Sequence, residues 1–300
     1  MELQLKNIGM IKEANVKIDG LTVIAGENDT GKSTLGKALY ILLNESKINT
    51  TLLIEKIFKK NDNFLDKAKL KNLFTIQDVI FVETPLVWNL QDYFQTSVNI
   101  ESHLKMLGED IDIPYPYLMK DLYFKLVTQK KQPVTANAYM NKRYTRDTLV
   151  HLMNGEFVQD KRTGLYYFHR DDEIYNLVNV ASGIKYFGLI QVLLDNSRLY
   201  KDIVLILDEP EVHLHPKWQL KMAEVIVDLV KNGVKIVVNS HSPYMIQALI
   251  KYARDAEIVD KTNFYLAQKD EEFSTFENVN DELNKIFELL AEPMNEVFEL

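Results

Sequence analysis

Residues 26–33 read Gly-Glu-Asn-Asp-Thr-Gly-Lys-Ser (GENDTGKS), the stretch from which the rest of the fold is best worked out. The run fits the pattern GxxxxGK[ST], in which glycines let the backbone curl until successive N–H groups face one anion. The segment before it, 21–25 (LTVIA), is short and apolar like a strand buried on both faces, and 35–43 has apolar residues at helical spacing. A glycine loop between a buried strand and the positive end of a helix predicts a phosphate-binding site.

Each part of this loop has an expected task. The glycines permit the turn, Lys32 is expected to reach the β and γ phosphates of a nucleotide, and the Ser33 hydroxyl is expected to ligate Mg²⁺. The residues predicted to bind the phosphates of ATP are Gly26, Asn28, Asp29, Thr30, Gly31, Lys32, Ser33 and Thr34.

Two acids end a second apolar segment, 203–209 (IVLILDE). Ligands bind at the carboxyl ends of strands in an α/β sheet, so this edge should face the phosphate loop. Asp208 is expected to hold Mg²⁺, directly or through water. Glu209 is expected to polarise the water that attacks the γ-phosphate.

Two further short motifs follow or precede buried elements. His241 stands in 239–243 (NSHSP), directly after the apolar segment 235–238 (KIVV), so it is expected to share the crevice with Glu209. Ser182 and Gly183 open a helical segment, where free N–H groups favour an anion. Because many helices begin with Ser-Gly, this second signal is weak by itself.

The remaining pattern predicts an α/β fold with a mainly parallel central sheet and N-terminal antiparallel strands. Alternating apolar residues predict half-buried strands at the N-terminus, and 79–82 and 263–267 are strand-like. The lysine-rich segment 51–74 is expected to be helical, and a helix over 281–290 is expected to stop at Pro293.

Taken together, these motifs resemble the ABC-type P-loop ATPase heads of the SMC, RecF and OLD-nuclease group. The most specific run is 208–216 (DEPEVHLHP), and 6–28 (KNIGMIKEANVKIDGLTVIAGEN) resembles the first strands of the same group. The chain is thus identified as an OLD-like ATP-binding protein of the AAA type. The nuclease domain of OLD proteins is not expected, because some sixty residues after His241 are too few for it.

The resemblance implies roles that the residues alone do not. Ser182 and Gly183 would form the signature motif, contacting the γ-phosphate of ATP held by another subunit. His213 and His215 would lie in a D-loop at the dimer interface, and His241 would be the switch histidine. Two ATP molecules with Mg²⁺ would then be sandwiched in a head-to-tail homodimer.

The resemblance covers 1–45 and 176–250 well and leaves the middle unmatched. This predicts a discontinuous ATPase core, 1–45 with 177–300, and an inserted, mostly helical lobe at 46–176. The signature reads ASGIK instead of LSGGQ. Where the Q-loop glutamine should follow the strand at 79–82, Glu-Thr-Pro stands at 83–85, and Gln77 precedes the strand.

Composition narrows the classes of function. The chain has no cysteine, which excludes disulfides and thiolate metal sites and fits a reducing cytoplasm. No run approaches the roughly 18 to 20 apolar residues of a membrane span. The net charge is −8. The stretch 117–150 holds seven Lys/Arg against two Asp/Glu, whereas 255–300 holds three against thirteen.

This asymmetry has two interpretations. In the first, the basic and acidic stretches simply form two differently solvated faces. In the second, the basic stretch forms a surface for DNA that includes Lys130, Lys131, Lys142 and Arg143. One hypothesis is therefore an ATPase that acts on DNA or drives a partner effector in genome maintenance, DNA repair or phage defence. The alternative is a slow ATP-gated scaffold or sensor that regulates a separate effector protein without binding DNA. A small-molecule kinase leaves the 208–216 run unexplained, and the base-reading motif of a GTPase is missing.

Overall fold

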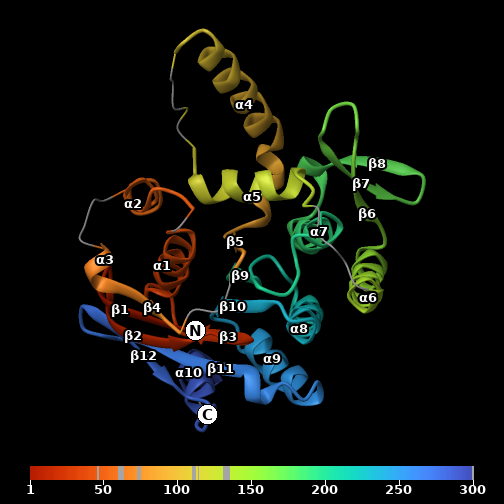
Figure 1. The fold of residues 1–300 in the computed structure, drawn as a ribbon. Helices are drawn as coiled ribbons and strands as arrows, with labels where there is room; N and C mark the ends of the chain where they lie inside the picture. Colours follow the sequence, from red (N-terminus) through yellow and green to blue (C-terminus); the bar gives the residue numbers. More distant parts are fainter. Residues whose placement is uncertain are drawn as a thin grey trace. The chain divides into compact units, whose positions relative to one another are not determined.

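A computed structural model of the chain describes residues 1–45, 47–59, 64–72, 76–109, 113, 115–130 and 136–298, with side chains except at 136–142 and 292–298. The chain forms two compact units, one made of 1–81 with 199–300 and one made of 82–198 (Figure 1). The first unit is built from both ends of the chain.

A nine-stranded sheet forms the centre of the first unit, with the order β4-β1-β2-β12-β11-β3-β10-β9-β5 (Figure 1). Its strands are β1 (Glu2–Ile8), β2 (Ile11–Lys17), β3 (Leu21–Ala25), β4 (Ala68–Lys71), β5 (Asp78–Val82), β9 (Ile203–Asp208), β10 (Lys235–Ser240), β11 (Thr262–Asp270) and β12 (Phe273–Asn278). The neighbours β11, β3, β10 and β9 run parallel, whereas β2, β1 and β4 form an antiparallel N-terminal ribbon. The predicted mainly parallel central sheet with N-terminal antiparallel strands is confirmed.

The parallel strands are apolar because both of their faces are covered. Every residue of β3 and of β9 is buried, which is the continuous apolar pattern expected of strands without a solvent face. β12 also pairs in parallel with β2, so the C-terminal part of the chain is hydrogen-bonded to the N-terminal ribbon. The carboxyl ends of β3, β10 and β9 therefore meet at one edge.

Helices cover the strands of this unit. They are α1 (Lys32–Asn44), α2 (Thr50–Phe58), α3 (Phe64–Lys67), α8 (Pro216–Lys231), α9 (Pro243–Asp255), the 3₁₀ turn η3 (Val259–Lys261) and α10 (Asn284–Phe298). α1 approaches the sheet closely at Gly36, where an added Cβ would lie 3.0 Å from the Phe81 ring and 3.2 Å from Ile206. The small residue lets the helix that follows the phosphate loop pack tightly on the strands.

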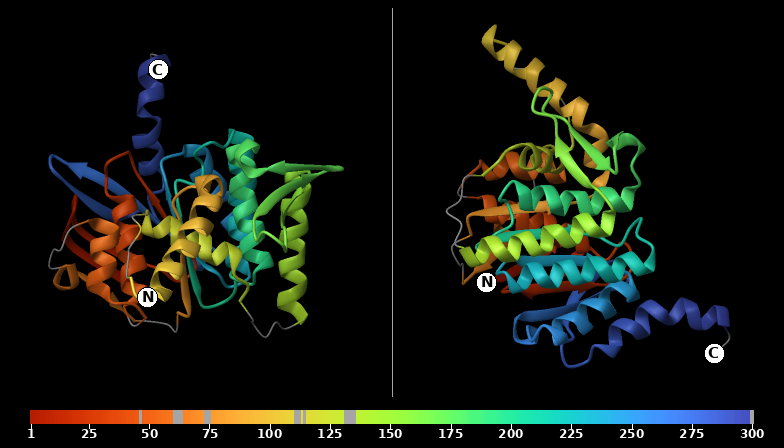
Figure 2. Two further views of the ribbon diagram at one scale, coloured as in Figure 1. Left: turned by 90° about the horizontal axis from the view of Figure 1, so that it is seen from above. Right: turned by 90° about the vertical axis from the view of Figure 1, so that its right-hand side faces the viewer.

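The second unit combines helices with a small sheet. Its elements are η1 (Pro85–Leu90), α4 (Gln91–Met106), α5 (Tyr117–Val127), α6 (Ala136–Met153), β6 (Glu156–Gln159), β7 (Tyr166–Arg170), β8 (Glu173–Asn176), η2 (Leu177–Asn179) and α7 (Ser182–Asp195). The strands form an antiparallel sheet in the order β6-β7-β8. The fully buried Trp88 packs against Phe157 and Tyr166, with ring centroids 5.4 and 5.3 Å away. Figure 2 shows α6 alongside α7 within this unit.

Two local predictions were wrong, and one strand was missed. Residues 68–71, expected to be helical, form β4, because the free edge of β1 offers hydrogen-bond partners that outweigh local propensity. β12 was not foreseen at all. α10 continues past Pro293. A proline removes only one backbone hydrogen bond, and the residues around it in α10 are good helix formers. The two compact units do not test the predicted insertion at 46–176, and that division stays a prediction.

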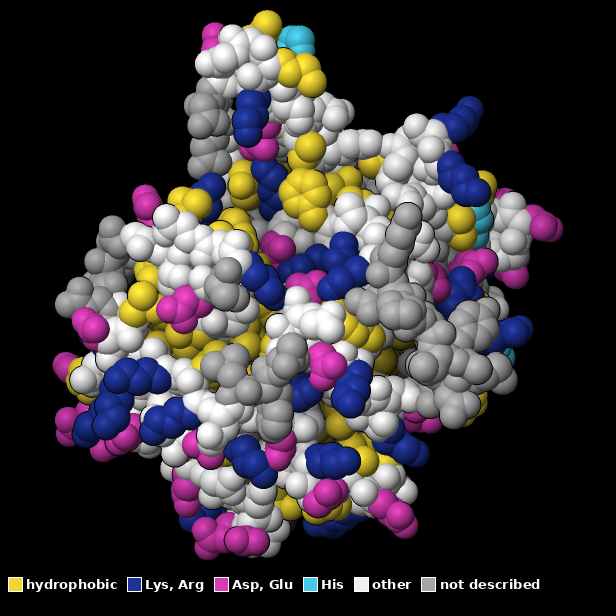
Figure 3. All heavy atoms as spheres, in the orientation of Figure 1, with side chains coloured by type: hydrophobic (Ala, Val, Ile, Leu, Met, Phe, Trp, Pro, Cys, Tyr) yellow, Lys and Arg dark blue, Asp and Glu magenta, His cyan; other side chains and the backbone are white. Residues whose placement is uncertain are grey.

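The surface of the first unit mixes both signs of charge. Figure 3 shows lysine and arginine side chains interleaved with acidic ones on the face in view. Ion pairs of the first unit include Lys6–Glu13 and Lys17–Asp19. Within the described ranges, no helix is both long and apolar enough to span a bilayer.

Candidate functional site: a phosphate loop facing two acidic strand ends

The glycine loop has the backbone that its sequence requires. Gly26 and Gly31 have φ values of +154° and +84°, which side chains disfavour. A Cβ on Gly26 would lie 2.4 Å from the carbonyl oxygen of Ala267, and one on Gly31 would lie 2.9 Å from Ile11. Both positions therefore need glycine for space as well as for conformation.

Lys32 lies over this loop at the first position of α1. It is only 4% exposed, and its Nζ donates to the carbonyl oxygens of Gly26 (2.9 Å) and Glu27 (2.6 Å). Burial lowers the pKa of Lys32, while the carboxylates at 208–211 act in the opposite direction. The ammonium group is thus held across the mouth of the loop, where phosphate oxygens would compete for it.

Two side chains in the middle of the loop make contacts within the protein. The Thr30 hydroxyl donates to the carbonyl oxygen of Glu27 at 2.8 Å, and Asp29 pairs with Lys269 at 2.9 Å. Asn28 is exposed. Any contact of Asp29 or Thr30 with a phosphate would therefore come from the backbone N–H groups.

Strand register places Asp208, a predicted metal ligand, beside Asn239 at the sheet edge. Asp208 at the end of β9 lies opposite Asn239 of β10, which donates from Nδ2 to Asp208 Oδ1 at 2.7 Å and to the carbonyl oxygen of Lys32 at 3.1 Å. Burial raises the pKa of Asp208, and hydrogen bonds from Asn239 and Ser33 oppose that shift. Asn239, which the sequence did not single out, ties the loop to the acidic strand end.

The donor set suits a magnesium ion that also binds phosphate. The described residues contain no cluster of three or more His, Cys, Asp or Glu that could hold a metal. Mg²⁺ commonly takes one or two protein oxygens and completes its octahedron with water and phosphate oxygens. The Ser33 hydroxyl beside the Asp208 carboxyl matches that requirement.

Glu209 and His241, predicted to share a crevice, are close in the structure. His241 Nδ1 lies 3.3 Å from Glu209 Oε1 and 3.5 Å from Glu211 Oε1, without the alignment of a hydrogen bond to either. Proximity to His241 lowers the pKa of Glu209, and Glu209 in turn raises the pKa of His241. Both side chains remain about one-third exposed, at 31% and 38%. The pair thus favours a carboxylate beside an imidazolium, open to solvent.

Glu211 is a residue of the site that sequence reasoning missed. It is 4% exposed, and its Oε1 accepts from the Ser240 hydroxyl (2.7 Å), the His241 N–H (2.8 Å) and the Ser242 N–H (3.2 Å). Burial raises its pKa, and these hydrogen bonds oppose the shift. The position of an acid three residues after Asp208, inside the DEPE run, was the available signal. One oxygen of Glu211 clamps the backbone that carries His241.

A second set of hydrogen bonds extends from this clamp. The Ser242 hydroxyl donates to Gln219 Oε1 at 2.6 Å, and Gln219 Nε2 donates to the carbonyl oxygen of Leu214 at 3.0 Å. Both Ser242 and Gln219 are buried. The histidine loop is thereby connected to the segment 213–216.

The two histidines of that segment differ in what they can offer. His213 is exposed and has a left-handed backbone with φ of +68°. His215 caps α8, because its Nδ1 accepts from the N–H of Lys217 at 3.2 Å. Only Nε2 of His215 is left for another molecule.

Ser182 and Gly183 lie in the second unit, at the N-terminus of α7 as predicted. The turn is fastened to η1 by two contacts of Lys185. Its Nζ donates to Asn89 Oδ1 at 2.7 Å, and its carbonyl oxygen accepts from the Trp88 indole at 3.1 Å. Ser182 is small and half-exposed at the start of an anchored helix, so it could contact an anion that is bound to another molecule.

Gln77 lies away from the predicted phosphate site. Its N–H donates to Asp202, just before β9 begins, at 2.8 Å. This is the amino end of the strand, opposite the edge that carries Asp208. At the other end of β5, the run 83–85 starts η1, with Thr84 capping it.

Replacing Glu211 with alanine is expected to lower the free energy of unfolding by about 3 kcal/mol, because a buried N–H group, a part-buried N–H group and a hydroxyl lose their shared acceptor. Glu211→Gln keeps an acceptor oxygen and should lose less than half as much. Urea titrations followed by circular dichroism compare the two variants. Equal losses would mean that the clamp does not act through that oxygen.

Comparison with known protein families identifies an ATPase domain. The protein-family model described as "AAA ATPase domain" matches residues 1–190, and a second AAA-domain model matches 139–247. The Septu protein PtuA of Bacillus thuringiensis is 43% identical over 49 residues, which are 16% of this chain and 12% of that protein. The aligned part is thus a small fraction of the curated relative.

Solved structures share the fold at low identity. The Smc head domain bound to the C-terminal domain of ScpA, derived from Pyrococcus furiosus, is 11% identical, with a TM-score of 0.50 and 98% of each chain covered. The SMC head domain from Thermotoga maritima is 13% identical, with a TM-score of 0.46 and coverage of 93% of this chain and 98% of that one. At 11% identity, the similarity to the Smc head domain shows a shared fold and nothing more.

Proposed function

The chain belongs to the AAA ATPase domain family, and from that premise we propose that it binds ATP with Mg²⁺ and hydrolyses it in the manner of ABC-type heads. The observation that carries this proposal is the convergence of Lys32, Asp208 and the Glu209–His241 pair at one sheet edge. The residues at this edge could bind nucleotide phosphates, ligate a metal ion and position the attacking water.

The residues divide the work in a simple way. The loop N–H groups and Lys32 hold the phosphates, and Ser33 with Asp208 would hold Mg²⁺, which supplies positive charge to the phosphate oxygens. The lowered pKa of Glu209 keeps it ionised, so it can accept a proton from the attacking water. His241 turns Nδ1 toward the two glutamates, which leaves Nε2 for a γ-phosphate oxygen.

We propose that two copies complete each site. Ser182 and Gly183 of one copy would contact the γ-phosphate bound to the other, in a head-to-tail dimer. His213 and the outer nitrogen of His215 would lie at that interface. The half-exposed Ser182 at the start of α7 and the exposed, left-handed residue His213 support this arrangement.

Mixing two inactive variants tests the composite site. Lys32→Ala removes phosphate binding in one copy, and Ser182→Arg blocks the signature turn in the other. In a 1:1 mixture, half of the dimers are mixed and each has one intact site, so about a quarter of wild-type ATPase activity should return. Each variant alone serves as the control. A mixture no more active than its components would contradict the trans arrangement.

The output of hydrolysis is proposed to pass through a separate effector protein, in a DNA-related or defence-related process. In one structure of the same fold, an Smc head is bound to the ScpA C-terminal domain. The alternative, a slow ATP-gated scaffold that does not bind DNA, would differ by holding its partner while ATP is intact.

Direct DNA binding stays a prediction. Lys131 lies outside the described residues, and the Lys142 side chain is not described. Arg143 pairs with Asp147 at 3.7 Å, and the Lys130 N–H donates to Asn196.

A further inference from the structure

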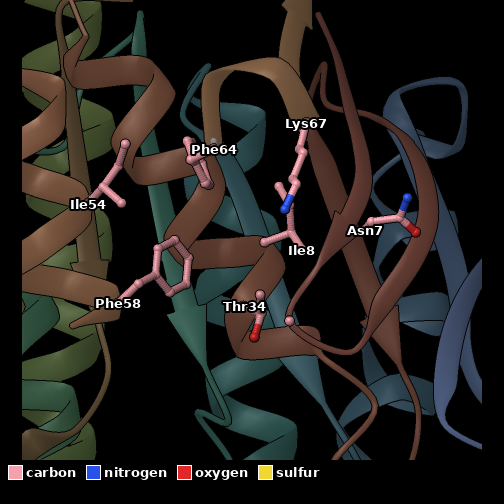
Figure 4. A pocket seen from close by; sticks show the side chains of 8 residues that line it. Asn7, Ile8, Thr34, Ile54, Phe58, Phe64 and Lys67 are labelled. Carbon is pink, nitrogen blue, oxygen red and sulfur yellow. The ribbon is translucent and has the colours of Figure 1, made fainter. Parts of the chain in front are cut away.

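The first unit is hollowed in more than one place. Figure 4 shows a pocket beside the phosphate loop, whose lining includes Thr34 and Phe58. A second hollow, with a volume of about 480 Å³, lies between α8, α9 and α10. Its lining starts at Pro243, two residues after His241. We call this second hollow the α9 groove.

The α9 groove is lined mainly by apolar side chains that remain accessible. Leu220 of α8 is 39% exposed and Tyr244 of α9 is 59% exposed. Ala248 of α9 and Phe287 in the first turn of α10 belong to the same lining. Apolar side chains gathered around one hollow, with charged residues at its edge, are typical of a surface that another protein chain covers.

The groove adjoins the proposed dimer interface. Leu220 lies on α8 shortly after its cap His215, and Tyr244 follows the histidine loop on α9. The hydrogen bond from Ser242 to Gln219 joins the starts of these two helices. A second copy that contacts the segment 213–216 would therefore be next to the groove.

α10 has the composition of a helix that fills an apolar groove. Ile286 is buried and Leu290 is half-buried, and the sequence continues this apolar spacing at 294, 297 and 298. Glutamates stand between them at 288, 292 and 296, whereas the lysine of the helix, Lys285, is paired with Glu277. Figure 2 shows the last turns of α10, at the blue end of the chain, extending away from the neighbouring helices.

The charge at the edge of the groove is complementary to that of α10. Lys251 belongs to the lining, and Lys217 is exposed one turn before Leu220 on α8. The acid Asp255 beside the groove is already paired with Lys251. An acidic amphipathic helix thus matches the groove in charge as well as in apolar character.

We propose that, in the ATP-bound dimer, the end of α10 of each copy packs into the α9 groove of the other. α10 begins in the wall of its own groove, at Phe287, so two grooves that face each other across a two-fold axis can exchange helices reciprocally. The inference rests on the proposed function, because it adds a contact to the dimer that encloses ATP. It gives the acidic C-terminal helix a role that the nucleotide site does not require.

Cross-linking through introduced cysteines tests which copy supplies the helix, because the natural chain has no cysteine. The variant carries Gln247→Cys in the groove, Ala291→Cys one turn after Phe287, and Glu209→Gln to keep ATP intact. With ATP and a short bis-maleimide, the expected main product on a denaturing gel is a covalent dimer. Each cysteine alone in the same background should give monomer and is the control. A bridged monomer, or no bridge in a sample that light scattering shows to be dimeric, would overturn the proposal.

A charge placed in the groove tests the same contact without a cross-linker. In the Glu209→Gln background, Leu220→Glu should weaken the ATP-bound dimer about tenfold or more, because it sets a carboxylate against an acidic helix. Leu65→Glu, at a 45% exposed leucine on α3, is the matched control and should leave the dimer unchanged. Equal dimer stability in the two variants would contradict the exchange. Failure of the proposed function looks different: Glu209→Gln alone would stay monomeric with ATP, which would refute the sandwich and the exchange together.

Discussion

Replacing Glu209 with glutamine is expected to lower kcat for ATP hydrolysis by about 10²- to 10⁴-fold while ATP binding persists, the range for loss of a positioned general base. Glutamine keeps the size of the side chain but cannot take a proton from water. It also removes the charge that raises the pKa of His241. Phosphate release under saturating ATP measures the loss of kcat. Equilibrium titration with ATP measures whether binding persists.

The variant has a structural consequence if two copies enclose the nucleotide. With ATP uncleaved, Glu209→Gln should accumulate as a dimer, detectable by light scattering. Glu224→Gln is the control, because Glu224 is an exposed carboxylate on α8 paired with Lys221 at 2.8 Å. Wild-type turnover in Glu209→Gln would show that another group accepts the proton, and a monomer with ATP would contradict the sandwich.

Replacing Lys32 with alanine is expected to weaken ATP binding by about 100-fold or more, since two charge-assisted hydrogen bonds to phosphate are each worth about 1.5–3 kcal/mol. ATPase activity should fall to background. Isothermal titration with ATP and with ADP measures the loss of affinity.

The free protein should not be destabilised by the same change. Burial lowers the pKa of Lys32, which means that the folded state penalises its charged form at neutral pH, and alanine removes that penalty. Alanine also removes the hydrogen bonds from Nζ to the Gly26 and Glu27 carbonyl oxygens, which opposes this gain, so the melting temperature without nucleotide should change little. Lys251→Ala, at an exposed lysine paired with Asp255, controls for loss of charge. If Lys32→Ala bound ATP normally, the loop would not be the phosphate site.

The recognition of an SMC- and OLD-like head from short motifs is confirmed by the family match and by the shared fold. Those motifs could be read because they are local. The glycines of 26–33 are required by backbone angles within the loop, and 203–208 is apolar because the strand is buried. Helical and strand periodicity along the chain carries that information directly.

Other features depend on partners that are distant in sequence. β4 formed in a lysine-rich segment because β1 offered a free edge, and β12 completed the sheet by pairing with β2. Local propensity cannot report such an edge, because it is supplied by another strand.

By itself, the sequence determined the phosphate loop, the acids at the end of β9 and the order of the elements around them. Only the tertiary structure decided that Asn239 joins Asp208 to Lys32, that Glu211 clamps the backbone of His241, and that α2 and α3 form a pocket beside Thr34. The physical reason is register and packing. Asn239 meets Asp208 and Lys32, which are 31 and 207 residues away in the sequence. These contacts depend on how the strands pair and how the helices pack on them, and no short stretch of chain carries that information.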